Sequence, residues 1–309
     1  MKVVVLGATG PVGKALIEEL KTAKGVEKIR AVSRSSTKKV DGKVTHMRGD
    51  LLDRTSVDTL IKGMDVAYLT AGLIYSTAIW QKEWPVIMEN ILMACEEYKV
   101  KFVFFDNIYA YGKVDGAMTE ETPLNPTSKK GEVRKQLQEM IMQKVKEKKL
   151  AAVIVKSADF YGPGAKLSLF YISNIESILK KQKPSWIGNP KTLHSFTYVP
   201  DAAKALVIAG MDKKANNQIW HVPTAKPLTG EEYMQLITRE MHMPNKYFTV
   251  NKTVFRIFGL FTSPVKELVE MFYQFDSDYI LRSEKFEKAF NFKPTPYKKG
   301  IKQTVSSFV

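Results

Sequence analysis

The chain has 309 residues, of which 44% are hydrophobic, and a formal net charge of +15. This composition excludes a disordered chain, and the length allows roughly one or two domains with a large core. No run reaches the roughly 18 apolar residues of a membrane span, and no cleavable signal pattern opens the sequence, so we expect a cytoplasmic protein without membrane association. The lysines are scattered in pairs without interleaved stacking aromatics, so we expect no nucleic-acid partner.

Cysteine and histidine are too sparse for a disulfide framework or a structural metal site. Cys95 is the only cysteine, which excludes an intramolecular disulfide. The four histidines, His46, His194, His221 and His242, have no ligand-type partner three or four residues away. We therefore expect no bound metal.

The first half of the sequence alternates short β-branched runs with amphipathic stretches. The pattern predicts strands near 2–7, 28–34, 43–50, 65–72, 100–106 and 151–158, and helices near 13–23, 56–64, 80–98 and 130–148. Strands that are apolar throughout and separated by helices are typical of a parallel sheet covered on both faces. The fold class expected is therefore α/β, with a doubly wound parallel sheet.

Beyond Asp159 the regular alternation of predicted strands and helices ends. Glycine and proline crowd residues 162–164 and 184–190, and long aromatic-rich helical segments dominate 230–290. This pattern indicates a second, smaller C-terminal lobe over the carboxyl edge of the sheet. The sequence shows no internal repeat and no low-complexity linker, so we expect the two parts to pack together.

The first strand ends in a glycine-rich turn, "VVVLGATGPVG", which spaces Gly7, Gly10 and Gly13 as GxxGxxG. Glycines allow a tight turn and a close approach of the backbone to a pyrophosphate, and the free N–H groups of the next helix attract its charge. Because a strand precedes the motif and a helix follows it, the motif predicts a dinucleotide site.

The end of the second strand favours NADP(H) over NAD(H). An NAD-binding chain carries an acid here for the ribose 2′-hydroxyl, whereas this chain reads Ser33, Arg34, Ser35 and Ser36. An arginine fork with serine hydroxyls suits a 2′-phosphate, which an acid would repel. The alternative is that Arg34 is a solvated loop cation.

Five motifs in order, "GATGPVG", "RGDLLD", "LTAG", "FYGPG" and "TYVPDAAKAL", resemble the extended short-chain dehydrogenase/reductase superfamily. Within it, the chain is similar to the NAD(P)-dependent epimerase/dehydratase group, which has a Rossmann fold. The resemblance implies that the pyrophosphate turn is formed by Gly7, Thr9, Gly10, Pro11, Val12 and Gly13. It also implies that Asp50 and Leu51 lie near the adenine, and that Thr70, Ala71 and Gly72 line the path of the cofactor.

The resemblance also implies the domain organisation. Residues 1–163 would form the dinucleotide-binding domain and 164–309 mainly the substrate lobe, with about 195–222 returning to the first domain. Asp201 would cap the helix that opens there. The alternative role for Asp50 is to cap the helix beginning near Thr55.

The family's acid–base residues are replaced in this chain. Typical members end strand five in Ser or Thr shortly before "YG", and the next helix carries Tyr-x-x-x-Lys, in which the tyrosine exchanges a proton during hydride transfer. Here "DNIYAYG" keeps Tyr111 and places Asn107 at the hydroxyl position, while Lys130 and Arg134 fall at the Tyr and Lys positions. Residues 113–145 contain no tyrosine.

Three possibilities remain open. Lys130 could donate the proton, with its pKa lowered by desolvation and by Arg134 one turn away. Tyr109 or Tyr111 could approach from the strand-five loop. Otherwise the site does little redox chemistry, and Lys130 and Arg134 hold an anionic group or form a solvated helix face.

The sequence therefore predicts an oxidoreductase or epimerase/dehydratase that uses NADP(H) and a small, anionic substrate, with a non-standard site of Asn107, Tyr111, Lys130 and Arg134. Asp159, at a strand end, could pair with Lys130 or Arg134, or cap the turn that follows it. A homodimer is compatible with the sequence. The alternative function is an NADP(H)-sensing regulatory protein.

Overall fold

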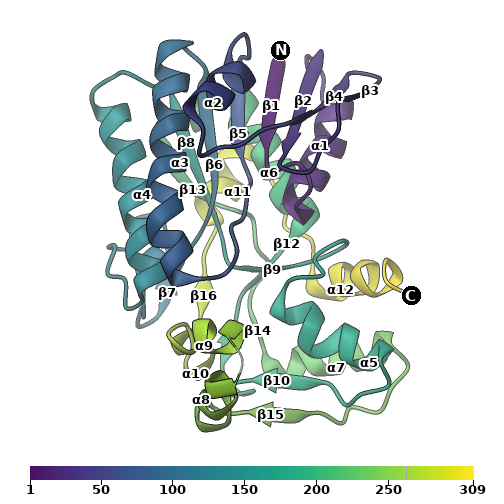
Figure 1. Ribbon diagram of the computed structural model, residues 1–309. Helices are drawn as coiled ribbons and strands as arrows, with labels where there is room; N and C mark the ends of the chain where they lie inside the picture. The colour runs from purple at the N-terminus through teal and green to yellow at the C-terminus, as the bar shows by residue number, and fades with distance from the viewer. Residues whose placement is uncertain (262) are drawn as a thin grey trace. The chain divides into compact units, whose positions relative to one another are not determined.

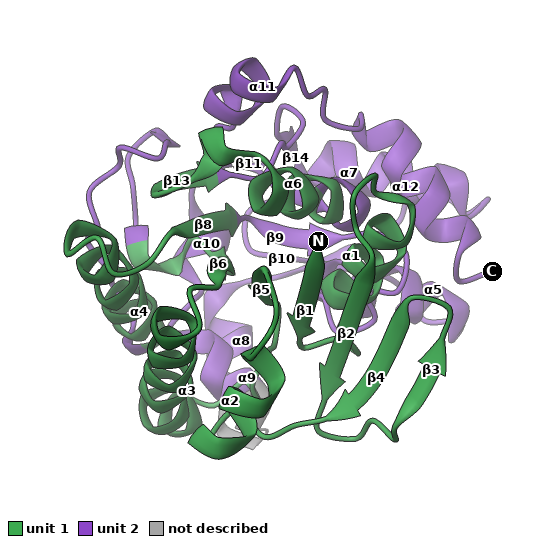
Figure 2. Cartoon of the chain, turned by 90° about the horizontal axis from the view of Figure 1, so that it is seen from above, with its two compact units in different colours: residues 1–110, 130–156, 202–220 green, residues 111–129, 157–201, 221–309 purple. Residues whose placement is uncertain are grey.

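The computed structural model describes residues 1–261 and 263–309, and the side chains of 258–264 lie outside this description. The chain divides into two compact units (Figure 2). Unit 1 comprises residues 1–110, 130–156 and 202–220, and unit 2 comprises 111–129, 157–201 and 221–309. Residues 111–129 thus group with unit 2, although they follow a strand of unit 1.

The eight-stranded sheet of unit 1 has the order β13-β8-β6-β5-β1-β2-β4-β3 (Figure 1). Its strands are β1 Lys2–Leu6, β2 Lys28–Ser33, β3 Lys39–Asp41, β4 Val44–Arg48, β5 Val66–Leu69, β6 Lys101–Asn107, β8 Ala152–Ser157 and β13 Gln218–His221. β1 pairs in parallel with both β2 and β5, and the short β3 pairs antiparallel with β4. The sheet winds outward from β1 in both directions, which confirms the predicted doubly wound α/β class.

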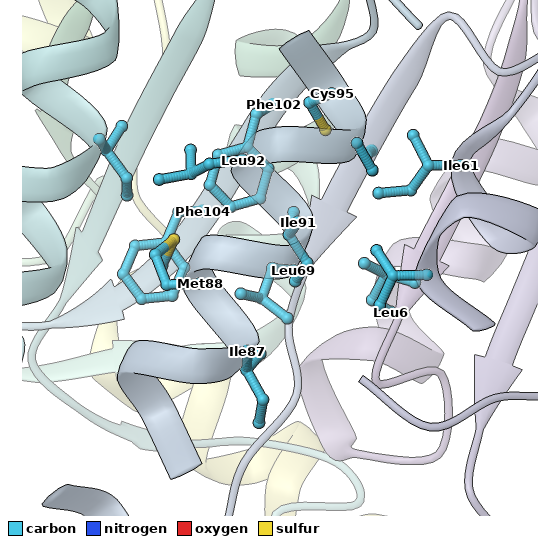
Figure 3. Close-up of a cluster of buried hydrophobic side chains, with 14 of the residues drawn as sticks. Leu6, Ile61, Leu69, Ile87, Met88, Ile91, Leu92, Cys95, Phe102 and Phe104 are labelled. Carbon is cyan, nitrogen blue, oxygen red and sulfur yellow. The ribbon is translucent and has the colours of Figure 1, made fainter. Parts of the chain in front are cut away.

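Helices pack on the sheet because its strands are apolar on both sides. The helices of this part of the chain are α1 Pro11–Thr22, α2 Arg54–Ile61, α3 Thr77–Glu97, α4 Lys129–Lys146 and α6 Val199–Met211, with short 3-10 turns η1 Tyr109–Tyr111 and η3 Lys213–Ala215. Alternate strand residues such as Leu6, Leu69 and Phe104 join α2, α3 and α4 in one buried cluster (Figure 3). Tyr68, which points the other way, packs against Gly210 of α6, where no larger residue fits.

Unit 2 has an aromatic core and only short strands. Its elements are β7 Ala117–Met118, β9 Asp159–Tyr161, the π-helix η2 Tyr171–Glu176, α5 Ser177–Leu179, β10 Ser185–Ile187, β11 Leu193–His194, β12 Phe196–Tyr198, β14 Leu228–Thr229, α7 Gly230–Glu240, β15 Phe248–Val250, α8 Lys252–Phe261, α9 Ser263–Val269, α10 Tyr273–Asp276, β16 Ile280–Leu281, α11 Glu284–Phe290 and α12 Tyr297–Ser306. Tyr161, Phe196, Tyr233 and Tyr297 lie at the centre of this core. No helix among the described residues is both long and apolar enough to cross a bilayer.

The structure contradicts two helix caps, the one considered as an alternative role for Asp50 and the one that the resemblance implied for Asp201. The cap of α2 is Asp53, whose carboxylate accepts from the N–H groups of Thr55 and Ser56. The helix begins at the residue after Asp53, Arg54. Asp201 lies inside the first turn of α6, which begins at Val199. Its carboxylate instead accepts from the backbone and hydroxyl of Thr295.

Candidate active site

The glycine turn between β1 and α1 has the geometry that its sequence predicts. Gly7 has a φ of +104°, a conformation that other residues rarely adopt, and its N–H donates to the carbonyl of Val32. Gly10 is the N-cap of α1, and Pro11 opens the helix. A side chain at Gly13 would collide with the carbonyl of Gly7. The turn is therefore tight, and the backbone of Gly7 lies close to the first turn of α1.

Residues at the end of β5 pack on this turn. The Thr70 hydroxyl donates to the carbonyl of Leu6 at 3.3 Å, and a β-carbon on Gly7 would collide with the backbone of Ala71. β1 and β5 flank the point at which the strand order reverses, and ligands of doubly wound sheets bind in the crevice at such a point. The structure thus brings together the predicted cofactor residues of the turn and of 70–72.

The loop after β2 is open to solvent at Arg34 and Ser35. The Ser33 hydroxyl is nearly buried and lies 2.6 Å from that of Ser36. Asp50 is exposed, and its carboxylate accepts from the N–H of Leu52, while the carbonyl of Leu51 accepts from the Asn90 amide. These contacts order both loops, and the cofactor contacts assigned to their residues stay predictions.

Asn107, at the end of β6, is fixed by two hydrogen bonds. Its Oδ1 accepts from the N–H of Tyr109 at 3.1 Å, and its backbone carbonyl accepts from Lys156 Nζ at 3.3 Å. Lys156, on β8, is fully buried and pairs at 2.7 Å with Asp106, the neighbour of Asn107. The strand end that carries Asn107 is therefore held by a buried ion pair.

Arg134 belongs to the same ion-paired cluster. Its Nη1 lies 3.3 Å from Asp106 Oδ1, and its guanidinium carbon lies 4.4 Å from the ring centroids of both Trp80 and Trp84. Burial lowers the pKa of Arg134, while the charge of Asp106 opposes this effect. An internal carboxylate and two indole faces occupy this guanidinium, which does not favour the interpretation that it holds an anionic substrate group or lies on a solvated helix face.

Lys130 lies one turn earlier on α4 and is also fully buried. Its Nζ donates to the hydroxyl of Thr77, the first residue of α3, at 2.8 Å. The same nitrogen lies 4.7 Å from the ring centroid of Tyr75, in the loop between β5 and α3. The structure therefore gives Lys130 a hydroxyl and an aromatic neighbour, and the interpretation of a solvated helix face is wrong for this residue.

Tyr111 falls in unit 2, where its hydroxyl lies 2.7 Å from Nε2 of His221. Nδ1 of His221 faces the carbonyl of Arg282 at 2.7 Å, so Nδ1 carries the proton and Nε2 accepts from the tyrosine. Asp159, also in unit 2, lies 3.2 Å from Nε2 of His194. A catalytic role for Tyr111 stays a prediction.

The sequence interpretation missed Tyr75, Thr77, Asp106 and Lys156. Asp106 and Lys156 had a usable signal, since each interrupts a strand that is otherwise apolar, and a charge buried in such a strand requires a partner. Tyr75 and Thr77 had no signal, because their contact with Lys130 depends on how α3 and α4 pack.

Residues 3–222 match the sequence model of the NAD dependent epimerase/dehydratase family. This match covers more than half of the chain, including the glycine turn after β1 and the end of β6 that carries Asn107. The chain therefore belongs to this family, and the resemblance inferred from its motifs is confirmed.

Curated relatives of the chain are distant. An uncharacterized UDP-glucose epimerase, YtcB, of Bacillus subtilis is 27% identical over 227 residues, which are 67% of this chain and 71% of the relative. A UDP-glucose 4-epimerase of Lactobacillus helveticus is 28% identical over 156 residues, 47% of this chain and 46% of that protein.

Solved structures share the fold along the whole chain. A dTDP-glucose 4,6-dehydratase of Bacillus anthracis in complex with NAD superposes with a TM-score of 0.82 at 17% identity, covering 100% of this chain and 96% of that one. A UDP-glucuronic acid 4-epimerase of Bacillus cereus in complex with NAD gives 0.82 at 17% identity, covering 99% and 98%. At this identity the likeness establishes the fold alone.

Proposed function

We propose that the chain is an enzyme that binds NADP(H) in unit 1 and acts on a small carbonyl or hydroxyl compound through a non-standard acid–base site. The nicotinamide, when bound, supplies or accepts the hydride. The observation that carries this proposal is the buried Lys130 ammonium, fixed on Thr77 at the position where the family's acid is expected. A buried polar group held in one geometry is typical of a site that handles protons.

The glycine turn supports the dinucleotide part of the proposal. A side chain at Gly7 or Gly13 would collide with neighbouring backbone, so the glycines keep the turn tight against the start of α1, a helix of 12 residues whose free N–H groups suit a pyrophosphate. The exposed Arg34 and the absence of an acid at the end of β2 support NADP(H) over NAD(H). The net charge of +15 supports an anionic substrate, and a sugar nucleotide is one candidate, since the curated relatives include UDP-glucose epimerases.

A titration tests the cofactor. NADPH and NADH are each added to the protein, and binding is followed by nucleotide fluorescence. We expect NADPH to bind more tightly, and Arg34→Ala to weaken NADPH at least about tenfold without weakening NADH. Arg239→Ala, which removes an exposed arginine of unit 2, is the matched control. Equal affinities for the two nucleotides in the native protein would refute the 2′-phosphate argument.

A turnover assay tests the enzyme. NADPH oxidation is measured with a panel of carbonyl compounds and sugar nucleotides, for the native protein and for Lys130→Met. We expect turnover that falls at least about 100-fold in the variant while NADPH affinity is retained.

One observation favours a second function, an NADP(H)-sensing binding protein. Arg134 stands where the family has its catalytic lysine, yet it is paired with Asp106 and enclosed by two tryptophans. Such a permanently charged group holds structure and exchanges no proton. Tight NADPH binding without turnover, together with partner binding that changes with the cofactor's redox state, would establish the sensor.

A further inference from the structure

Tyr75, which the family's motif does not account for, lies beside Lys130 in unit 1. Tyr75 follows the predicted cofactor residues 70–72 by three positions, in the loop that joins β5 to α3. Its ring packs edge-on against Trp80, with centroids 5.5 Å apart at an angle of 79°. Lys130 Nζ lies 4.7 Å from the same ring centroid. The ring is therefore held between an indole and an ammonium group.

A second cation acts on this tyrosine. Burial lowers the pKa of Arg134, and the charges of Asp106 and of the Tyr109 and Tyr75 hydroxyls oppose this effect. Lys130 thus lies over the ring of Tyr75, and Arg134, one turn later on α4, interacts electrostatically with the same side chain.

We propose that Tyr75 is the catalytic acid–base hydroxyl of this protein, with Lys130 as the cation that activates it. This inference rests on the proposed function and deepens it. The protein would keep a tyrosine and a lysine, as in the family, but each would come from a different position in the sequence. The lysine comes from the position of the usual tyrosine on α4, and the tyrosine comes from the loop after β5.

The proton and electron balance of the step is that of an alcohol oxidation and its reverse. As a substrate C–H bond gives its hydride to the oxidised nicotinamide, the Tyr75 phenolate takes the proton of the substrate hydroxyl, and a carbonyl forms. In the reverse direction the Tyr75 phenol would return that proton to the carbonyl oxygen, and a bound reduced nicotinamide would supply the hydride. Lys130 keeps its proton throughout and stabilises the phenolate.

The other candidate hydroxyls are engaged differently. Tyr109 stacks on Trp80 with nearly parallel rings, 6.4 Å apart at 16°. Tyr111 donates to His221 within unit 2. Tyr75 combines the ammonium contact with a place in the loop that continues the predicted cofactor path.

A protection experiment tests the location of Tyr75 without a known substrate. The protein is nitrated with tetranitromethane, with and without NADP⁺, and each tyrosine is quantified by peptide mass spectrometry. We expect NADP⁺ to slow nitration of Tyr75 at least about fivefold and to leave Tyr98 unchanged. Tyr98 is the matched control, since it is also half-buried and has Lys62 over its ring at 5.8 Å. Protein that binds NADP⁺ in a direct titration but leaves Tyr75 unprotected would overturn the inference alone, whereas absence of binding would overturn the proposed function as well.

Turnover tests the role. Tyr75→Phe keeps the ring and its contact with Lys130, and we expect it to lower kcat at least about 100-fold while the affinity for NADPH changes less than twofold. The limb of the pH–rate profile that reports the acid should disappear, which a merely structural tyrosine would not cause. Tyr98→Phe should match the native enzyme. Retained kcat in Tyr75→Phe, or a panel that yields no turnover despite cofactor binding, would refute the catalytic assignment.

Discussion

The sheet of unit 1 has a lysine above a tyrosine ring at each end, and the two rings have different charged neighbours. At the carboxyl end of the strands, Lys130 lies over Tyr75, and Arg134 is the next cation along α4. At the amino end, Lys62 lies over Tyr98, between α3 and β6. The contact itself is the same in both places.

The surroundings of Tyr98 are acidic. Burial raises the pKa of Tyr98, and so do a hydrogen bond with Glu97 and the charges of Asp58 and Glu97, which outweigh the opposing effect of Arg54. An ionised phenol is therefore disfavoured at the amino end, whereas at the carboxyl end Arg134 interacts electrostatically with Tyr75. The comparison teaches that neighbouring charges, more than the lysine–tyrosine contact, decide whether such a pair can exchange protons.

The largest expected effect is that of Asp106→Asn at the carboxyl end. The change leaves Lys156 and Arg134 as buried cations without the carboxylate of Asp106. We therefore expect the free energy of unfolding to fall by about 3–5 kcal/mol. Urea unfolding measures the difference.

The control is an exposed ion pair, Arg54 with Glu97 at 2.9 Å, in which the glutamate side chain is 56% exposed. Glu97→Gln should cost less than about 1 kcal/mol, because water screens the pair. Equal losses in the two variants would mean that burial does not distinguish the two ion pairs.

A smaller effect is expected from two glycines of positive φ. Gly7→Ala places a methyl group against the backbone of Ala71, so we expect NADPH affinity to fall at least about tenfold. Gly25, with a φ of +87° at the amino end, has open space around it. Gly25→Ala should lower stability by only about 1–2 kcal/mol and leave NADPH binding intact. Equal NADPH affinity in both variants would contradict a cofactor role for the glycine turn.

The sequence predicted the features that depend on neighbouring residues. The apolar strands, the glycine turn and the helices of unit 1 follow from short-range patterns, and the doubly wound sheet follows from their order. The contact of Tyr75 with Lys130 joins residues 55 positions apart and depends on the packing of α3 on α4, which no local pattern specifies. The caps failed because the sequence does not fix a helix start to the residue, and the cap of α2 is Asp53, three residues after Asp50.

A further expected effect is a pH dependence of stability at the amino end, where Lys101 opens β6. Burial of its ammonium lowers the pKa of Lys101 to about 8, against a partly opposing charge from Asp212. Between about pH 8 and the ordinary lysine value of about 10.5, the unfolded chain binds more protons at this group, so its contribution to stability rises with pH. The native protein should therefore gain stability relative to Lys101→Met as the pH rises from 7 to 10, measured by urea unfolding. Lys28→Met, an exposed lysine at the start of β2, should show no such change. A constant difference for Lys101→Met would mean that this lysine is as well solvated in the folded protein as in the unfolded chain.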